Sequence, residues 1–138
     1  APNNDPGSAD IFRTLDALPK DRFRVLPSMR FAHFSELMKN AACMVGNSSA
    51  GVREAPFLGS PSLDLGTRQS NRSDAPSVTA CEASDRAAIL DFLHTHWGRQ
   101  AIPHDGFGQG TAAERFVATL ADPGFWTLSL QKAFRDIG

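Results

Sequence analysis

The sequence predicts an α/β fold, a Rossmann-like and mainly parallel sheet with helices on both of its faces. Short apolar runs alternate along the chain with segments of helical periodicity, which is typical of this class. The run at 42–45 is apolar throughout yet too short for a helix, as expected of a strand buried on both faces. The length of 138 residues, 41% of them hydrophobic and 21% charged, fits a single domain spanning 1–138.

Before this run, the sequence predicts two helices and one strand. Ser8 or Asp10 can cap a helix that reaches about residue 18, where a proline follows. Segment 23–27 has the apolar character of a short strand. Segment 31–39 places its large apolar side chains at helical spacing, so we expect a helix whose apolar face points inward.

From the run at 42–45 onward, strands and helices alternate. We expect this strand to be central in the sheet and a helix to follow it from Ser48 or Ser49 to about residue 58, limited or kinked by Pro56. Two further strands are predicted at 62–65 and 77–80. The later helices are predicted at 84–97, 111–120 and 124–138, with a glycine-rich stretch at 105–110.

The turn that follows the predicted strand at 42–45 holds the residues that point to a ligand-binding site. Ligands of doubly wound sheets bind beyond the carboxyl ends of the strands, where a helix N-terminus offers free N–H groups to an anion. Ser48 and Ser49 add hydroxyl donors there, and Gly51 allows close approach to the backbone. Glu54, one turn later, could accept hydrogen bonds from both hydroxyls of a ribose. A nucleotide is one interpretation, and an ordinary helix cap with a solvated Glu54 is the other.

The polar loop at 66–76 is the second candidate region. It is long for a connection between buried strands, which favours a ligand-binding role. Arg68 and Arg72 could clamp phosphate oxygens, or they could be exposed surface charges.

These motifs together resemble the hydrolysing UDP-N-acetylglucosamine 2-epimerases. The resemblance rests on Gly46-Asn47-Ser48-Ser49-x-Gly51-x-x-Glu54-Ala55-Pro56, on Gly66-Thr67-Arg68-Gln69-x-x-Arg72, on Pro2-Asn3-x-Asp5-x-Gly7-Ser8 and on Gly108-Gln109-Gly110. It spans nearly all of the chain. The Ser-Gly-Gly turn and the Thr-Glu-Arg-Pro loop of the non-hydrolysing relatives do not occur here.

The resemblance implies a role for each matching position. Ser48 and Ser49 would hold the diphosphate with Gly51 beside them, Glu54 would bind the ribose, and Arg68 with Thr67 would face the phosphates. Phe34 and the backbone near Met29 would receive the uracil, and Asn3 would approach the active-site cleft. Gln109 departs from the family, whose members commonly carry an acidic residue there, and this leaves the role of that loop open.

The resemblance also implies a division of labour between two domains. Family members have two Rossmann-like domains in the glycosyltransferase-B arrangement, and this chain resembles the second, so we expect a C-terminal fragment whose partner is its own N-terminal domain. The reaction forms UDP and the free 2-epimeric sugar for sialic-acid-type sugar biosynthesis, with no cofactor and no metal. The acid-base residues are expected outside this chain, which alone would be inactive, with Arg68 as a leaving-group stabiliser.

Other classes of function stay in view. A nucleotide-sugar-binding domain of a glycosyltransferase and a stand-alone, non-catalytic nucleotide-binding module are alternatives, and a homo-oligomer is left open. The net charge of -1 and the absence of Lys/Arg blocks argue against nucleic acid as a partner. No apolar run approaches the ~18 residues that a membrane span needs. With two cysteines and no signal peptide, we expect a cytoplasmic protein with reduced thiols.

Overall fold

The computed structural model describes residues 6–26, 28–127, 129 and 131. Asn3, predicted as a site residue, lies outside them. No helix among the described residues has both the length and the apolar character needed to cross a membrane.

The core is a sheet of parallel strands, β1 (Met44–Gly46), β2 (Ser62–Leu65) and β3 (Val78–Cys81), in the order β1-β2-β3. Gly46, Asp64 and Ala80 lie in register across it, so the carboxyl ends of the strands meet at one edge. The predicted parallel α/β fold is therefore confirmed. The prediction that the strand at 42–45 is central is wrong, because β2 holds that position in the described sheet and leaves Val45 of β1 exposed.

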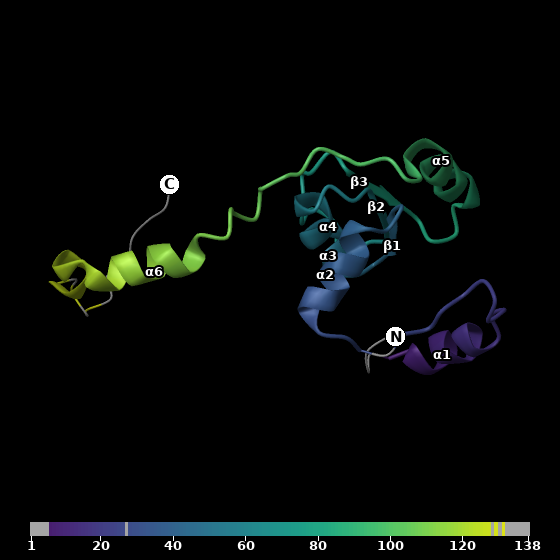
Figure 1. Cartoon of the computed structure of the whole chain (residues 1–138), viewed down its shortest axis with the longest axis horizontal. Coiled ribbons are helices and arrows are strands. Elements are labelled where there is room, and N and C mark those ends of the chain that lie inside the picture. Colours follow the sequence, from purple (N-terminus) through teal and green to yellow (C-terminus); the bar gives the residue numbers. More distant parts are fainter. Residues whose placement is uncertain (1–5, 27, 128, 130, 132–138) are drawn as a thin grey trace.

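Helices cover both faces of this sheet, as predicted. Figure 1 shows the strands between α5 (Arg86–His96) on one side and α2 (Phe31–Lys39), α3 (Ser49–Val52) and α4 (Glu54–Phe57) on the other. A Cβ at Gly51 would lie 2.7 Å from the Ser62 Oγ, so only a glycine lets α3 lie this close to β2. Ser60 Oγ donates a 2.8 Å hydrogen bond to the Met38 carbonyl and ties α2 to the start of β2.

The helix predicted from Ser48 or Ser49 to about residue 58 is two short helices. It breaks at Arg53, one turn before Pro56. Proline has no N–H to donate to the carbonyl four residues earlier, here Val52, and its ring crowds that carbonyl. The break gives Glu54 a place in the first turn of α4.

The prediction of a strand at 23–27 is wrong. Residues 23–26 form no strand in the part of the chain that the structure describes, and residue 27 lies outside it. Phe23, Val25 and Leu26 instead line a cavity of about 560 Å³ together with residues of α1 (Ser8–Asp16) and α2. Phe23 and Val25 nevertheless remain 47% and 39% exposed, so the apolar run forms one wall of this cavity and is not buried in the sheet.

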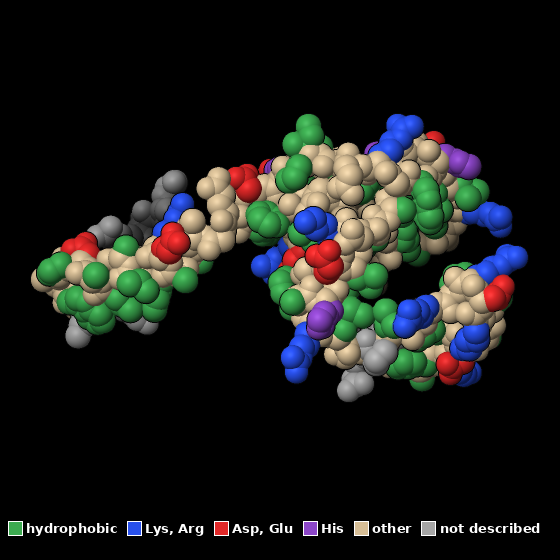
Figure 2. Space-filling model, in the orientation of Figure 1, with side chains coloured by type: hydrophobic (Ala, Val, Ile, Leu, Met, Phe, Trp, Pro, Cys, Tyr) green, Lys and Arg blue, Asp and Glu red, His purple; other side chains and the backbone are tan. Residues whose placement is uncertain are grey.

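The chain beyond residue 105 leads to α6 (Ala112–Ala121) and the 3-10 helix η1 (Pro123–Thr127), drawn in yellow-green away from the sheet in Figure 1. Trp126 Nε1 donates a 2.8 Å hydrogen bond to the Leu120 carbonyl and holds η1 against the end of α6. Most of the helix predicted at 124–138 lies outside the described residues. Figure 2 shows hydrophobic side chains gathered along one side of this arm.

Candidate functional site

The predicted phosphate turn lies at the carboxyl end of β1, as expected. Asn47 follows the strand, and Ser48 is the N-cap of α3, where its Oγ accepts a 3.3 Å hydrogen bond from the Ala50 N–H. Ser48 and Ser49 are both exposed at this edge of the sheet. Gly51 is buried on the sheet side of α3, so its missing side chain serves the contact with β2.

A side chain that the sequence argument did not single out joins this turn to the loop after β2. Gln69 is 4% exposed, and its Nε2 donates a 3.0 Å hydrogen bond to the Asn47 carbonyl. Its Oε1 accepts a 3.2 Å hydrogen bond from Arg72 Nη1. Thr67 and Arg68 are exposed on the same loop. The contact therefore fixes the loop that carries both predicted phosphate-facing residues to the turn that carries the serines.

Asp64 is a second residue that the sequence argument missed. It lies near the end of β2 in register with Gly46, and it is 3% exposed. Its Oδ1 is buried and accepts no hydrogen bond from any residue that the structure describes. Burial raises the pKa of this carboxyl group above its ordinary value. The available signal was an acidic residue between two leucines, Leu63 and Leu65, in a short strand.

Glu54 lines a cavity of about 370 Å³. Its Oε2 is buried, as is the Oγ of Ser35 on α2, and neither atom has a hydrogen-bond partner among the described residues. The remaining side chains of the cavity are largely apolar: they include Phe31, Phe57, Leu58 and Phe107. A mostly apolar pocket with a few polar atoms whose hydrogen bonds are unmade is typical of a small-molecule site.

Met29 and Phe34, the positions suggested for the base, line the cavity of about 560 Å³ on the α1 side of α2. Phe31 lines both this cavity and the one beside Glu54. The structure thus brings the serines and the Thr67–Arg68 pair to one edge of the sheet. Glu54 lines one of the two cavities and Met29 and Phe34 line the other, with Phe31 of α2 in the wall of both.

The described residues hold no group of three or more His, Cys, Asp or Glu side chains arranged to hold a metal ion. Cys43 and Cys81 are free thiols, each half-buried, and burial raises the pKa of both. The candidate site therefore consists of hydroxyls, a carboxylate, arginines and aromatic walls, which is chemistry suited to a phosphorylated, hydroxyl-rich ligand.

Comparison with known proteins agrees with this chemistry. The family model described as UDP-N-acetylglucosamine 2-epimerase matches residues 1–121. The chain is 40% identical over 99% of its length to a UDP-N-acetylglucosamine 2-epimerase of Neisseria meningitidis serogroup B, and covers 37% of that protein.

Two further relatives match shorter parts. A GDP/UDP-N,N'-diacetylbacillosamine 2-epimerase (hydrolyzing) of Campylobacter jejuni is 38% identical over 45% of this chain, which is 16% of that protein. The polysialic acid biosynthesis protein P7 of Escherichia coli is 35% identical over 63% of this chain, which is 22% of its own length. The chain thus spans less than two fifths of these relatives.

Proposed function

Because the chain belongs to the UDP-N-acetylglucosamine 2-epimerase family, we propose that it is the UDP-binding domain of an enzyme of the hydrolysing kind. The substrate would be UDP-N-acetylglucosamine or a 2,4-diacetamido relative, and the products UDP and the free 2-epimeric sugar. The observation that carries this proposal is the Gln69 contact, which gathers Ser48, Ser49 and Arg68 at one edge of a parallel sheet.

The hydrolysing assignment has two supports. The Campylobacter jejuni relative is named as a hydrolyzing 2-epimerase, and the Escherichia coli relative is named for polysialic acid biosynthesis. The chain also has the Asn47-Ser48-Ser49 turn and the Gly66-Thr67-Arg68-Gln69 loop in place of the motifs of the non-hydrolysing relatives. These features favour a role in the synthesis of sialic-acid-type sugars.

In the proposed reaction, a base removes the proton at sugar C2 and the bond between C1 and the UDP oxygen breaks, which leaves a glycal. Water then adds across the double bond of the glycal. The hydroxyl group bonds to C1, and a proton bonds to C2 from the opposite face, so the configuration at C2 is inverted. The acid-base groups would lie outside this chain, in an N-terminal domain that acts as its partner. This chain would supply binding and the stabilisation of negative charge on the departing diphosphate by Arg68 and the serine hydroxyls.

The test is turnover of UDP-N-acetylglucosamine by the full-length protein in D₂O. We expect release of UDP together with free N-acetylmannosamine that carries deuterium at C2. Water labelled with ¹⁸O should leave UDP unlabelled, because the C1–O bond breaks and the oxygen stays with phosphorus.

Other results would contradict the proposal in distinct ways. Accumulation of UDP-N-acetylmannosamine without free UDP would assign the protein to the non-hydrolysing kind. UDP release only with an acceptor, and without deuterium at C2, would indicate a glycosyltransferase. Binding without turnover in the full-length protein would leave a nucleotide-binding module.

A further inference from the structure

A cavity that the proposed function does not use lies at the amino edge of the sheet. Its volume is about 450 Å³, within the range of small-molecule pockets. Its wall includes Pro61, just before β2, and Pro76 and Ser77, just before β3. The turn with Ser48 and Ser49 follows the carboxyl end of β1. The cavity and this turn are therefore at opposite edges of the same parallel sheet.

The segment at 98–104, which follows α5, supplies the other wall of the cavity. The Gly98 N–H donates a 3.1 Å hydrogen bond to the Ala42 carbonyl, and the Ala101 N–H donates a 2.8 Å bond to the Gly59 carbonyl. Ala42 comes before β1 and Gly59 before β2, so the segment crosses the amino edge of the sheet. Main-chain hydrogen bonds therefore hold this wall in place without a ligand.

Ser77 gives this cavity a hydroxyl group whose hydrogen bonds are unmade. The residue is 9% exposed, and its Oγ is buried with no hydrogen-bond partner in the part of the chain that the structure describes. Its main chain is fixed, because the Ser77 carbonyl accepts a 2.9 Å hydrogen bond from the Ser62 N–H. A buried polar atom without a partner is costly to the folded state. A rotation about χ1 of Ser77 would let a ligand in the cavity complete its hydrogen bonds.

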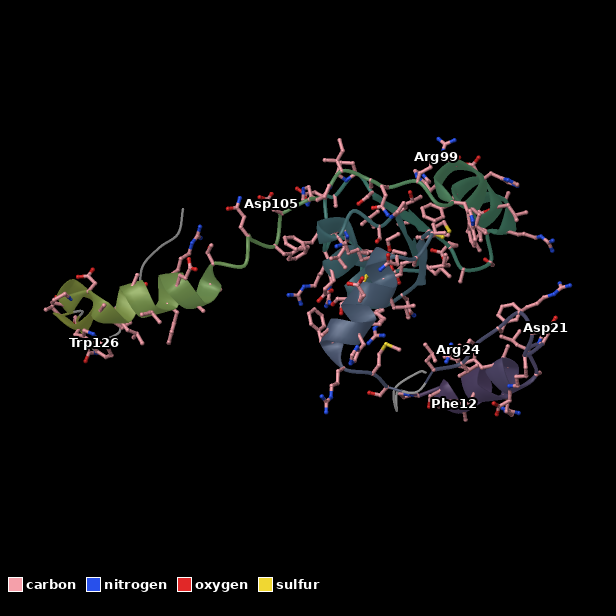
Figure 3. All side chains as sticks on the ribbon, viewed as in Figure 1. Phe12, Asp21, Arg24, Arg99, Asp105 and Trp126 are labelled. Carbon is pink, nitrogen blue, oxygen red and sulfur yellow. The ribbon has the colours of Figure 1, made fainter. Side chains whose placement is uncertain are left out.

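The charged side chain of the cavity wall is basic. Arg99 is exposed and forms no ion pair with a described residue, and His96 and His104 line the cavity with it. Figure 3 labels Arg99 beside α5. Among the described residues no Asp or Glu lines the cavity, and the Asp74 Oδ1 lies 3.7 Å from the His104 Nε2. A guanidinium group with no carboxylate partner favours an anionic ligand.

The rest of the wall is apolar. Pro61, Pro76 and Pro103 contribute rings of fixed shape, and Ile102 is 89% exposed. Apolar surface of this kind is stabilised when an apolar group covers it and removes it from water. The ligand that fits this cavity therefore combines an anionic group with an apolar body.

We infer that the cavity at the amino edge is a second binding site, for a small organic carboxylate with an apolar body. The carboxylate accepts hydrogen bonds from the Arg99 guanidinium and the Ser77 hydroxyl, and the apolar body packs against Ile102 and Pro103. The site is separate from the proposed diphosphate turn, so the same chain can hold both ligands at once.

The test uses 4-fluorobenzoate as the probe, with its binding to the full-length protein followed by ¹⁹F NMR. We expect saturable binding that is unchanged when UDP is present at saturation. The neutral analogue 4-fluorobenzyl alcohol should bind at least about tenfold more weakly, because it lacks the charge that Arg99 recognises. Inorganic phosphate should fail to displace the probe, because it has no apolar body.

Two variants test the residues that hold the carboxylate. Arg99→Gln should weaken the binding of 4-fluorobenzoate about tenfold, and Ser77→Ala should weaken it about two- to fivefold. Ser77→Ala should not lower the urea midpoint of unfolding, because the lost hydroxyl has no partner in the described structure. Arg86→Gln and Ser84→Ala, both at exposed positions, are the matched controls and should bind the probe as the wild type does.

The possible outcomes separate this site from the proposed function. A wild type that shows no saturable binding of 4-fluorobenzoate, or that releases it when UDP binds, would overturn this inference. Arg99→Gln with unchanged affinity, or with no greater loss than Arg86→Gln, would overturn it as well. A protein that binds 4-fluorobenzoate as expected but does not bind UDP would contradict the proposed function and leave this site in place.

Discussion

The side-chain amide of Gln69 donates a 3.0 Å hydrogen bond to the main-chain carbonyl of Asn47, across 22 residues of sequence. This bond joins the two loops that leave the carboxyl ends of neighbouring strands. One loop carries the serines proposed for the diphosphate, and the other carries Arg68. The relative position of these groups therefore depends on a residue that need not touch the ligand.

Gln69→Glu should weaken the contact between these two loops. The substitution keeps the shape of the side chain but replaces the donor with an oxygen that faces the Asn47 carbonyl, at a position that is 4% exposed. We expect the free energy of unfolding to fall by about 1–3 kcal/mol and UDP binding to weaken. Urea unfolding and calorimetry would measure both. Gln100→Glu, at an exposed position, is the matched control and should change neither.

Glu54→Gln should remove the recognition of ribose. A carboxylate that accepts hydrogen bonds from sugar hydroxyls contributes about 1.5–3 kcal/mol, so the dissociation constant of UDP should rise roughly 10- to 100-fold. The wild type should prefer UDP over 2'-deoxy-UDP, and the variant should lose most of this preference. Competition binding with the two nucleotides measures it. An undiminished preference in the variant would exclude Glu54 from the ribose site, and Glu82→Gln serves as the exposed control.

Arg68→Ala in the full-length enzyme should lower kcat more than it weakens substrate binding. A cation near the diphosphate interacts more strongly with the charge that develops as UDP departs than with the bound substrate. We expect a loss of about 1.5–3 kcal/mol in kcat/KM, most of it in kcat. Steady-state kinetics would reveal this, with Arg86→Ala, at an exposed position of α5, as the comparison. A change in KM alone would assign Arg68 to ground-state binding.

The sequence predicted correctly those elements whose formation depends mainly on residues within the same segment. The helix at 31–39 was predicted with the bounds that the structure has, because helical spacing of apolar side chains is a property of the segment itself. The parallel strands and the capped turn at Ser48 follow from similarly local signals. The same approach failed for the segment at 23–27. A strand forms only where a neighbouring strand can pair with it, and a run of apolar residues does not show whether such a neighbour is present.

The parts of the site that were missed depend on distant contacts. The partner of Gln69 lies 22 residues earlier, and no spacing rule connects them. Asp64 is one of two polar residues in a four-residue strand, and nothing within the strand shows that the folded chain leaves this carboxyl group only 3% exposed. The cavity beside Glu54 combines α2, α4 and a loop that begins 51 residues after Glu54, at 105. Its walls could not be assigned before the fold was known.

Asp64→Asn should become more stable relative to the wild type as the pH rises toward neutrality. Burial raises the pKa of Asp64, so the folded state holds the proton more tightly than the unfolded state does. The stabilising effect of that proton is fully present below the ordinary value of 3.8 and is lost as the pH rises through the higher value of the folded state. Above that value the wild type keeps an ionised, buried carboxylate.

The variant has an amide that does not ionise. Its stability relative to the wild type should therefore grow as the pH rises from below 3.8 through the higher pKa of the folded state, and then level off. Urea unfolding across this range measures the difference. Asp91→Asn, at an exposed position of α5, should give no such pH-dependent gain. An advantage that shrinks toward neutral pH would contradict the assignment.

The last prediction concerns the arm formed by α6 and η1, which exposes several large apolar side chains. Phe116 and Val117 are each 64% exposed and Trp126 is 67% exposed, and α6 has no buried residue. Contiguous apolar surface of this kind favours association. We expect the 138-residue chain to self-associate through this arm, and Phe116→Glu with Val117→Lys to reduce the association while adding no net charge. Light scattering over a range of concentrations would show it. Phe57→Glu with Val45→Lys, which changes exposed apolar residues elsewhere, is the matched control, and a wild-type chain that stays monomeric at all concentrations would refute the prediction.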